Sequence, residues 1–283
     1  MIAIRVDFSS DIGFGHLKRQ EAFIKWKMKN ENLKKEDFVI LCKECDEKHT
    51  DIPVIKIKNE EDFFEKIKKI KPNEVVVDNY NFTYEDEKKF KTLFKEIKLV
   101  CFDDLYQNHC CDVIVNINPY AKVYKYKNLP SHTKVLIKRP ILREEFYKQK
   151  RKKHKKKGIF ISFGGTDAKG IGLKVLQTLK PLKKEVHFYT TSANKNLEKL
   201  KKFCFLHKWC HLHINEDVAK GMAKAEFGII TPSQIMWEAL FMKMPFLAIK
   251  VADNQKYNTR YLKSKNIKVL SEREIYKVPR FIP

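Results

Sequence analysis

The sequence predicts a two-domain α/β protein with a parallel sheet in each half and a ligand cleft at the carboxyl ends of the strands. Short runs of β-branched residues alternate with segments long enough for helices, which is typical of βαβ units. The alternation pauses at the basic run Lys150–Lys157 and then starts again. With 283 residues the chain has room for two medium-sized domains, and we place them at 1–140 and 141–283.

The expected strands follow one another in chain order through both halves. In the first half they are Ile2–Val6, Phe38–Leu41, Glu74–Val77, Leu99–Phe102 and Val113–Val115. In the second half they are Ile159–Phe163, Val186–Thr190, His211–Ile214, Phe227–Ile230 and Phe246–Ile249. Helices are expected between them, among others at Leu17–Lys29, Phe64–Lys71, Glu87–Lys98 and Asn196–Lys202.

Composition favours a globular protein of the cytoplasm. Hydrophobic residues make up 43% of the chain, which is ample for buried cores. No stretch approaches the roughly 20 apolar residues of a membrane span, and no export signal precedes the first strand. The 7 cysteines are irregularly spaced, so we expect reduced thiols rather than a disulfide framework.

The formal charge of +23 raises a second possibility, a basic protein that binds nucleic acid or an anionic membrane surface. However, the lysines are mixed with glutamates along amphipathic helices, which favours solvated surfaces. The dense run Lys150–Lys157 is expected to be an exposed connector between the domains. Nucleic acid is therefore not the expected partner.

The first candidate site, Asp7–His16, directly follows the first strand. Gly13 and Gly15 suit a turn that passes close to a ligand. The next helix points its N-terminal amides at the same place, which favours a diphosphate. His16 lies at this opening, where an imidazole can act as a general base. Asp7 is expected to orient the ring, to bind a sugar or only to form the turn.

Two further candidate sites follow strands of the second half. The turn Ser162–Asp167 places glycines at a strand end, with Thr166 or Asp167 available as the N-cap of the next helix. In Thr231–Glu238, Pro232 suits the start of a helix, and its free amides with the Ser233 hydroxyl can hold phosphate oxygens. Glu238 lies farther along that helix, where a carboxylate can accept hydrogen bonds from ribose hydroxyls.

A longer pattern of residues runs in order along the chain. Its members are Asp7, Ser9, Ile12, Gly13, Gly15, His16, Arg19, Asp78, Asn79, Tyr80, Asp103, Asp104, Asn116, Asn118, Leu142–Phe146, Gly164–Asp167, Trp237, Glu238, Asn254 and Gln255. This pattern resembles the hydrolase family of pseudaminic acid biosynthesis, whose members act on UDP-2,4-diacetamido-2,4,6-trideoxy-β-L-altropyranose. The resemblance extends from residue 5 to about residue 255 and departs from the family pattern at Lys138–Pro140 and Thr231–Gln234.

The resemblance implies two Rossmann-like domains of the glycosyltransferase-B kind, similar to the lipid II-forming N-acetylglucosaminyltransferase. It also implies that His16 takes a proton from water, which attacks the anomeric carbon with inversion and releases UDP. Because UDP is a good leaving group, we expect no cofactor and no essential metal ion, and we expect a monomer. The implied substrate-binding residues are Asp7, Ser9, Gly13, Phe14, Gly15, Asp78, Tyr80, Arg143, Gly164, Gly165, Thr166, Asp167, Ser233, Gln234, Glu238, Asn254 and Gln255.

Three other interpretations are weaker. A glycosyltransferase of the same fold would use His16 to deprotonate an acceptor hydroxyl instead of water. The pair Cys42 and Cys45 with His49 nearby, and the pair His211 and His213, hint at zinc, but a single C-x-x-C is weak evidence. The neighbouring cysteines at 110 and 111 suggest no function.

Overall fold

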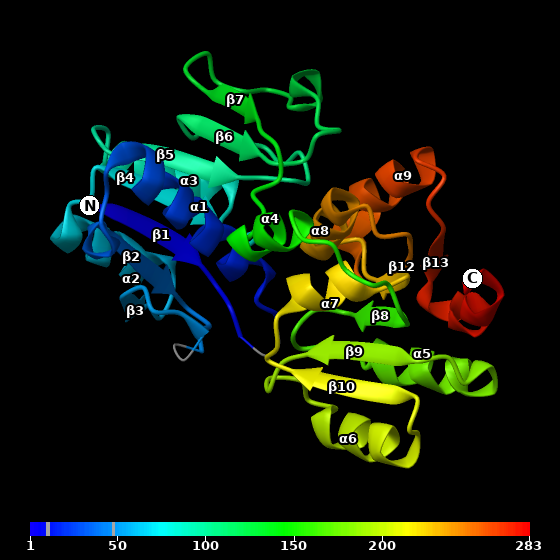
Figure 1. The fold of residues 1–283 in the computed structure, drawn as a ribbon. Coiled ribbons are helices and arrows are strands. Elements are labelled where there is room, and N and C mark those ends of the chain that lie inside the picture. Colours follow the sequence, from blue (N-terminus) through cyan, green and yellow to red (C-terminus); the bar gives the residue numbers. More distant parts are fainter. Residues whose placement is uncertain (10–11, 47–48) are drawn as a thin grey trace. The chain divides into compact units, whose positions relative to one another are not determined.

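The computed structural model describes residues 1–9, 12–46 and 49–283, and the chain forms two compact units (Figure 1). The first unit comprises Met1–Ser9 and His16–Ile141. The second comprises Leu142–Pro283 together with the described residues 12–15. Each unit has its own parallel sheet and its own hydrophobic core.

The first unit is a 7-stranded sheet with the strand order β3-β2-β1-β4-β5-β6-β7. Every pairing is parallel. The elements are β1 (Ile2–Val6), α1 (Gly15–Glu31), β2 (Phe38–Cys42), β3 (Val54–Lys56), α2 (Glu60–Ile70), β4 (Glu74–Asp78), α3 (Tyr84–Leu93), β5 (Lys98–Phe102), β6 (Val113–Asn116) and β7 (Lys134–Ile137), with short 3-10 turns at Lys35–Asp37 and Val123–Lys125.

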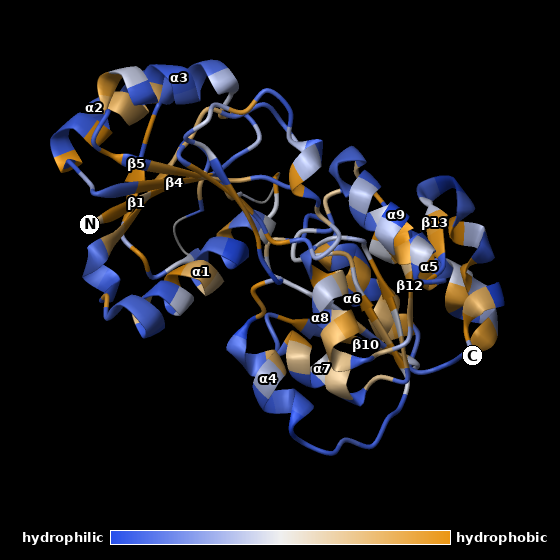
Figure 2. Cartoon of the chain, turned by 90° about the horizontal axis from the view of Figure 1, so that it is seen from above, coloured by the Kyte–Doolittle hydropathy of each residue, from blue (hydrophilic) through white to orange (hydrophobic). Residues whose placement is uncertain are grey.

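Both faces of this sheet are covered, which is why its central strands are apolar at nearly every position. All residues of β1, β2 and β4 are buried. Helices α2 and α3 lie on one face and α1 on the other, with the strands between them coloured as hydrophobic (Figure 2). Phe63, Phe90 and Leu99 are fully buried in the core under α2 and α3.

The second unit is a 6-stranded parallel sheet with the order β10-β9-β8-β11-β12-β13. Its elements are α4 (Glu144–Lys150), β8 (Ile159–Ser162), α5 (Ile171–Leu179), β9 (Val186–Thr190), α6 (Leu197–Leu206), β10 (Cys210–Ile214), α7 (Val218–Lys224), β11 (Phe227–Ile230), α8 (Gln234–Met242), β12 (Phe246–Lys250), α9 (Lys256–Ser264) and β13 (Val269–Ser271), with 3-10 turns at Lys180–Leu182, Asp253–Gln255 and Glu272–Phe281.

Helix α3 differs from its sequence prediction at both ends. Thr83 and Asp86 form a capping box, in which the Asp86 amide donates to Thr83 Oγ1 at 3.3 Å, so the helix begins at Tyr84 instead of Glu87. It ends at Leu93, because β5 already starts at Lys98. The short strands β3, β7 and β13 were not predicted, because they are partly exposed edge strands without a continuous apolar run.

The basic run Lys150–Lys157 is largely exposed, as expected, but it does not connect the two units. It joins α4 to β8 inside the second unit, where α4 packs on α7 and α8. No helix in the described ranges is long and apolar enough to cross a membrane.

Two cysteine pairs correct the expectation of reduced thiols. The structure joins Cys42 to Cys45 and Cys204 to Cys210 as disulfides. The Cα atoms are 5.9 Å apart in the first pair and 4.9 Å apart in the second, and both distances suit a disulfide. Sequence spacing alone did not show that the ends of α6 and β10 approach each other so closely.

Candidate active site

His16 and Asp78 meet at the centre of the first sheet. Asp78 is the last residue of β4 and pairs with Val6 of β1. His16 is the second residue of α1, the helix that follows β1. The strand order reverses between β1 and β4, and ligands of open α/β sheets bind outside the carboxyl ends of the strands at such a switch point.

The imidazole is held by a buried carboxylate. His16 Nδ1 lies 2.5 Å from Asp78 Oδ1, and the His16 side chain is 25% exposed whereas that of Asp78 is 1% exposed. Nδ1 also lies 3.0 Å from Arg19 Nη2, which can only donate. Because the carboxylate is the nearer partner and an ionised carboxylate only accepts hydrogen bonds, we assign the proton to Nδ1. Nε2 then has the free lone pair that a general base needs.

Helix α1 supplies two more donors to Asp78. Arg19 Nε donates to Asp78 Oδ2 at 2.8 Å and its Nη2 pairs with Oδ1, while Gln20 Nε2 donates to Oδ2 at 2.7 Å. The spacing of i, i+3 and i+4 puts His16, Arg19 and Gln20 on one helix face. Although burial alone would raise the pKa of Asp78, the charges of Arg19 and His16 hold it well below its usual range.

A second carboxylate extends the network. Arg19 Nη1 donates to Asp104 Oδ2 at 3.1 Å, and the Tyr80 hydroxyl donates to Asp104 Oδ1 at 2.8 Å. The Tyr80 ring stands edge-on to His16, with ring centroids 4.8 Å apart. Burial, with the charge of Asp104, raises the pKa of Tyr80 well above its usual range. Tyr80 is therefore a hydrogen-bond donor at this site at ordinary pH.

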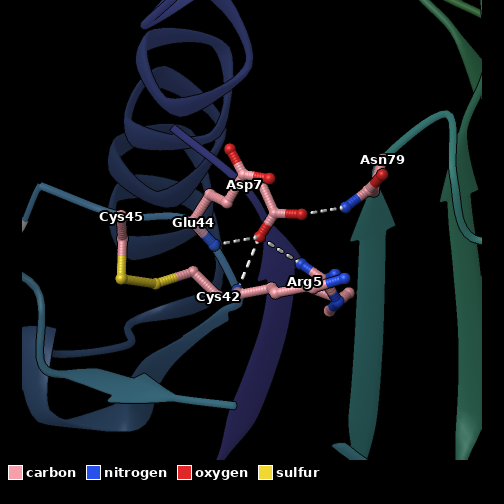
Figure 3. The surroundings of a disulfide bond; sticks show 7 residues. Arg5, Asp7, Cys42, Glu44, Cys45 and Asn79 are labelled. Carbon is pink, nitrogen blue, oxygen red and sulfur yellow. Dashed lines mark hydrogen bonds and ion pairs between the residues drawn. A yellow bond between two sulfur atoms is a disulfide. The ribbon is translucent and has the colours of Figure 1, made fainter. Parts of the chain in front are cut away.

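Asp7 belongs to a neighbouring network and does not orient the ring. Its Oδ1 accepts from Arg5 Nη1 at 2.6 Å, and its Oδ2 accepts from Asn79 Nδ2 at 2.6 Å (Figure 3). The backbone amides of Lys43 and Glu44 donate to Oδ1 at 2.7 and 3.2 Å, next to the Cys42–Cys45 disulfide. Burial alone would raise the pKa of Asp7, but the Arg5 guanidinium and these amides lower it.

The glycine turn before His16 has the backbone that the sequence suggested. Gly13 has a φ of +88°, and a Cβ added there would meet no atom within 4 Å. Gly15 opens α1 and is equally uncrowded. Phe14 between them is partly buried, as is Ser9 at the start of the motif. Ser10 and Asp11, also part of the motif, lie outside the described residues.

In the second unit, three candidate segments follow neighbouring strands and lie at the carboxyl ends of those strands. Gly164–Asp167 follows β8, Thr231–Gln234 follows β11, and Asn254 and Gln255 follow β12. The pairing of Ser162 with Ile230 brings the first two together. Gln255 Nε2 donates to Thr231 Oγ1 at 2.8 Å and so ties the third to the second.

The turn after β8 uses its side chains for internal bonds. Gly164 has a φ of +83° with open space around it. The Gly165 carbonyl accepts hydrogen bonds from Thr190 Oγ1 and Thr191 Oγ1, both at 2.9 Å. Asp167 accepts from the first two amides of α5 at 2.9 and 2.8 Å. Burial raises the pKa of Asp167 to about 6.

Helix α8 starts later than Pro232 suggested. Ser233 is its N-cap and Gln234 its first residue, so Pro232 precedes the helix. Glu238 is buried, and its oxygens accept from Arg143 Nε at 2.9 Å and Nη2 at 3.0 Å. Burial raises the pKa of Glu238, although the Arg143 charge opposes this. The predicted ribose ligand is thus paired with another predicted site residue.

The residues that hinted at zinc have other partners in the structure. Cys42 and Cys45 are joined as a disulfide, and His49 Nε2 lies 3.2 Å from Asp46. His213 Nε2 lies 3.0 Å from His187 Nδ1, and its Nδ1 lies 2.8 Å from Glu216.

Sequence reasoning missed Gln20 altogether, and it named Arg19 and Asp104 only as residues that match the family, without a role at the site. The i, i+3, i+4 spacing from His16 was the signal for Gln20 and Arg19. The signal for Asp104 was the polar pair Asp103 and Asp104 directly after a strand.

Comparison with known proteins gives relatives along the whole chain. A UDP-2,4-diacetamido-2,4,6-trideoxy-β-L-altropyranose hydrolase from Campylobacter jejuni subsp. jejuni is 34% identical over 279 residues, covering 95% of this chain and 98% of that protein. An uncharacterised protein from Methanocaldococcus jannaschii is 27% identical over 275 residues, covering 88% of this chain and 55% of that protein. No protein-family model matches the chain.

Solved structures show the fold. MurG from Acinetobacter baumannii is similar with a TM-score of 0.62 and 14% identity, covering 99% of this chain and 89% of that chain. The spinosyn rhamnosyltransferase SpnG, in complex with spinosyn aglycone, is similar with a TM-score of 0.67 and 10% identity, covering 99% of this chain and 91% of that chain. The architecture is therefore that of the glycosyltransferase-B fold, as the sequence predicted.

Proposed function

Because this chain belongs to the UDP-2,4-diacetamido-2,4,6-trideoxy-β-L-altropyranose hydrolase family, we propose that it hydrolyses this nucleotide sugar to the free sugar and UDP. The single observation that carries the mechanism is the His16–Asp78 pair, fixed by Arg19 and Gln20 at the switch point of the first sheet.

His16 acts as the general base in this proposal. Nε2 takes a proton from water as the water oxygen attacks the anomeric carbon, and the bond from that carbon to the diphosphate oxygen breaks. Asp78 stabilises the imidazolium that forms, because its Oδ1 lies 2.5 Å from Nδ1 and accepts the hydrogen bond from that nitrogen. Attack from the face opposite UDP inverts the anomeric centre.

The leaving UDP is bound by the second unit. The segments after β8, β11 and β12 provide backbone amides and hydroxyls at one sheet edge, as bound phosphate requires. Such groups stabilise the charge that grows on the diphosphate, so the chemical step needs no metal ion. Glu238 binds the ribose hydroxyls through the lone pairs that Arg143 leaves free.

The proposal extends to the pathway, the location and the oligomeric state of the enzyme. It supplies the free sugar for pseudaminic acid, which decorates flagellin or other surface glycans in the bacteria that make it. It acts in the cytoplasm as a monomer, with the UDP-sugar and water as its only reactants.

The test is UDP release from the nucleotide sugar in heavy-oxygen water, without any acceptor and with EDTA added just before the substrate. The proposal predicts turnover with the heavy oxygen on the sugar and none in UDP, because water attacks carbon and not phosphorus. NMR recorded early in the reaction should show the inverted anomer first.

Two results would redirect the assignment. Tight UDP binding without UDP release points to a glycosyltransferase that needs an acceptor. Label in UDP shows attack at phosphorus and contradicts the role given to His16.

A further inference from the structure

A buried cluster of potential metal ligands lies in the first unit, apart from His16. Glu87 comes from α3, Cys101 from β5, and His109 and Cys111 from the loop before β6. One ligand atom from each of the four lies within 4.8 Å of the other three, and all four residues are buried. The proposed hydrolysis uses none of them.

The donor set is one that zinc prefers. Two thiols, an imidazole and a carboxylate suit a borderline-soft ion, and thiolates discriminate against magnesium and calcium. A tetrahedral zinc ion holds sulfur at about 2.3 Å and nitrogen or oxygen at about 2.0 to 2.2 Å, so its ligand atoms are roughly 3 to 4 Å apart. The cluster therefore needs only small side-chain movements to close around an ion.

One carboxylate oxygen already contacts two of the other three ligand side chains. Glu87 Oε1 lies 2.6 Å from His109 Nδ1 and accepts from the Cys101 thiol at 3.3 Å. Glu87 Oε2 accepts from the Cys110 and Cys111 amides at 2.7 and 3.0 Å. These amides hold the carboxylate by its second oxygen and leave Oε1 toward the other ligands. Hydrogen bonds of this kind commonly orient metal ligands in proteins.

The outer nitrogen of His109 is also placed for a metal ligand. His109 Nε2 is buried and has no hydrogen-bond partner within the described part of the chain. It lies 3.8 Å from Asp103 Oδ1. If Nδ1 binds the ion, a small rotation lets Nε2–H donate to Asp103, which gives the carboxylate–histidine–metal arrangement common in proteins.

We propose that Glu87, Cys101, His109 and Cys111 bind one zinc ion as a structural site. Binding displaces the protons of both thiols and of His109 Nδ1, and the ion takes their place between the four ligand atoms. The site is closed, with four protein ligands and no exposed position for water, so the ion has no part in hydrolysis.

This site would hold the loop that carries the outer part of the candidate active site. Asp103 accepts hydrogen bonds from the Tyr126 hydroxyl at 2.7 Å and from the Tyr106 amide at 2.8 Å. The next residue, Asp104, pairs with Arg19. Zinc would therefore keep Asp104 in place through Asp103, although it touches neither His16 nor Asp78.

The experiment uses the full chain without a polyhistidine tag, purified under reducing conditions. Inductively coupled plasma mass spectrometry should find about one zinc ion per chain. Cobalt(II) added to zinc-depleted protein should give the thiolate charge-transfer and tetrahedral d–d absorption bands. The spectrum tests the wild type directly, so it does not depend on whether a variant folds.

Cys110 offers a matched control, because it lies between the two loop ligands and its own thiol instead faces the Tyr84 carbonyl at 3.8 Å. The zinc affinity of Cys101→Ser and of Cys111→Ser should fall by about tenfold or more. Cys110→Ser and the Cys42→Ser/Cys45→Ser double variant should bind zinc as the wild type does. Wild-type protein that binds neither zinc nor cobalt when reduced overturns the proposal. Loss of zinc binding only in the Cys42→Ser/Cys45→Ser variant would also overturn the proposal, because it would place the ion at those two cysteines. Neither result contradicts the proposed hydrolysis, which UDP release tests separately.

Discussion

Replacing Asp78 by asparagine should separate the orientation of His16 from substrate binding. In the wild type, Asp78 Oδ2 accepts hydrogen bonds from Arg19 and Gln20, so an asparagine would keep its oxygen at that position. Its amide nitrogen, which is a donor, would then replace Oδ1. If this nitrogen faces the ring, His16 must accept at Nδ1 and carry its proton at Nε2. The ring is then the wrong tautomer for a base.

The expected loss can be worked from the contacts. Removing an orienting carboxylate behind a catalytic histidine costs about 10³- to 10⁴-fold in kcat. KM should change little, because both oxygens of Asp78 are already engaged by His16 and α1; a raised KM would instead support the substrate-binding role that the resemblance implies for Asp78. Stability should fall by about 3 to 5 kcal/mol, because Arg19 loses a buried ionic partner.

Asp104→Asn is the matched control. It also removes a carboxylate partner of Arg19, at 3.1 Å, but Asp104 bonds Arg19 and Tyr80 rather than His16, and its side chain is 22% exposed. It should cost about 1 kcal/mol of stability and about tenfold or less in kcat. Steady-state UDP release and urea unfolding of both variants check this. Equal losses of kcat in the two variants, or an Asp78→Asn enzyme within about threefold of wild type, would refute the reasoning.

Three further predictions concern the second unit. Glu238→Gln should weaken UDP binding by about tenfold, measured by calorimetry, because ribose loses a charged acceptor; unchanged affinity would leave Glu238 only its pairing with Arg143. Asp167, with a pKa raised from 3.8 to about 6, holds a proton in the folded state that the unfolded chain has released between these values. Its contribution to stability therefore falls as pH rises from about 4 to about 6, by up to about 3 kcal/mol, and urea unfolding of Asp167→Asn should lack this fall; an identical pH profile would contradict the raised pKa. Gly165→Ala places a Cβ 2.9 Å from Thr191 Cγ2 and should cost about 1 to 3 kcal/mol in thermal or urea unfolding; adding Thr191→Ser, which removes that methyl group, should recover part of the loss, and no recovery would show that the clash is not the cause.

The parts of the fold that follow from local patterns were predictable. Apolar runs such as Ile2–Val6 and Val186–Thr190 are strands with the predicted bounds. The positions of the glycine turns followed from the same pattern, since a turn after a parallel strand lies at its carboxyl end. The missed strands β3, β7 and β13 lie at sheet edges and are partly exposed, so they lack the continuous apolar run of a central strand.

The contacts of the candidate site were harder to predict because they join distant parts of the chain. That Asp78 and not Asp7 meets His16 depends on the register that pairs Val6 with Asp78. The bonding of Arg143 to Glu238 depends on the packing of α4 near α8.

The ligand cluster was invisible for a similar reason. Cys101 and Cys111 suggest nothing as isolated positions, and only the placement of α3 brings Glu87 between them.

The most direct test of the account compares His16→Asn with wild type for UDP release from UDP-2,4-diacetamido-2,4,6-trideoxy-β-L-altropyranose, with UDP affinity measured on both proteins. The account predicts that release falls by about 10²- to 10⁴-fold while UDP binds equally well, because only the base is lost. Release at the wild-type rate from the His16→Asn protein would contradict it.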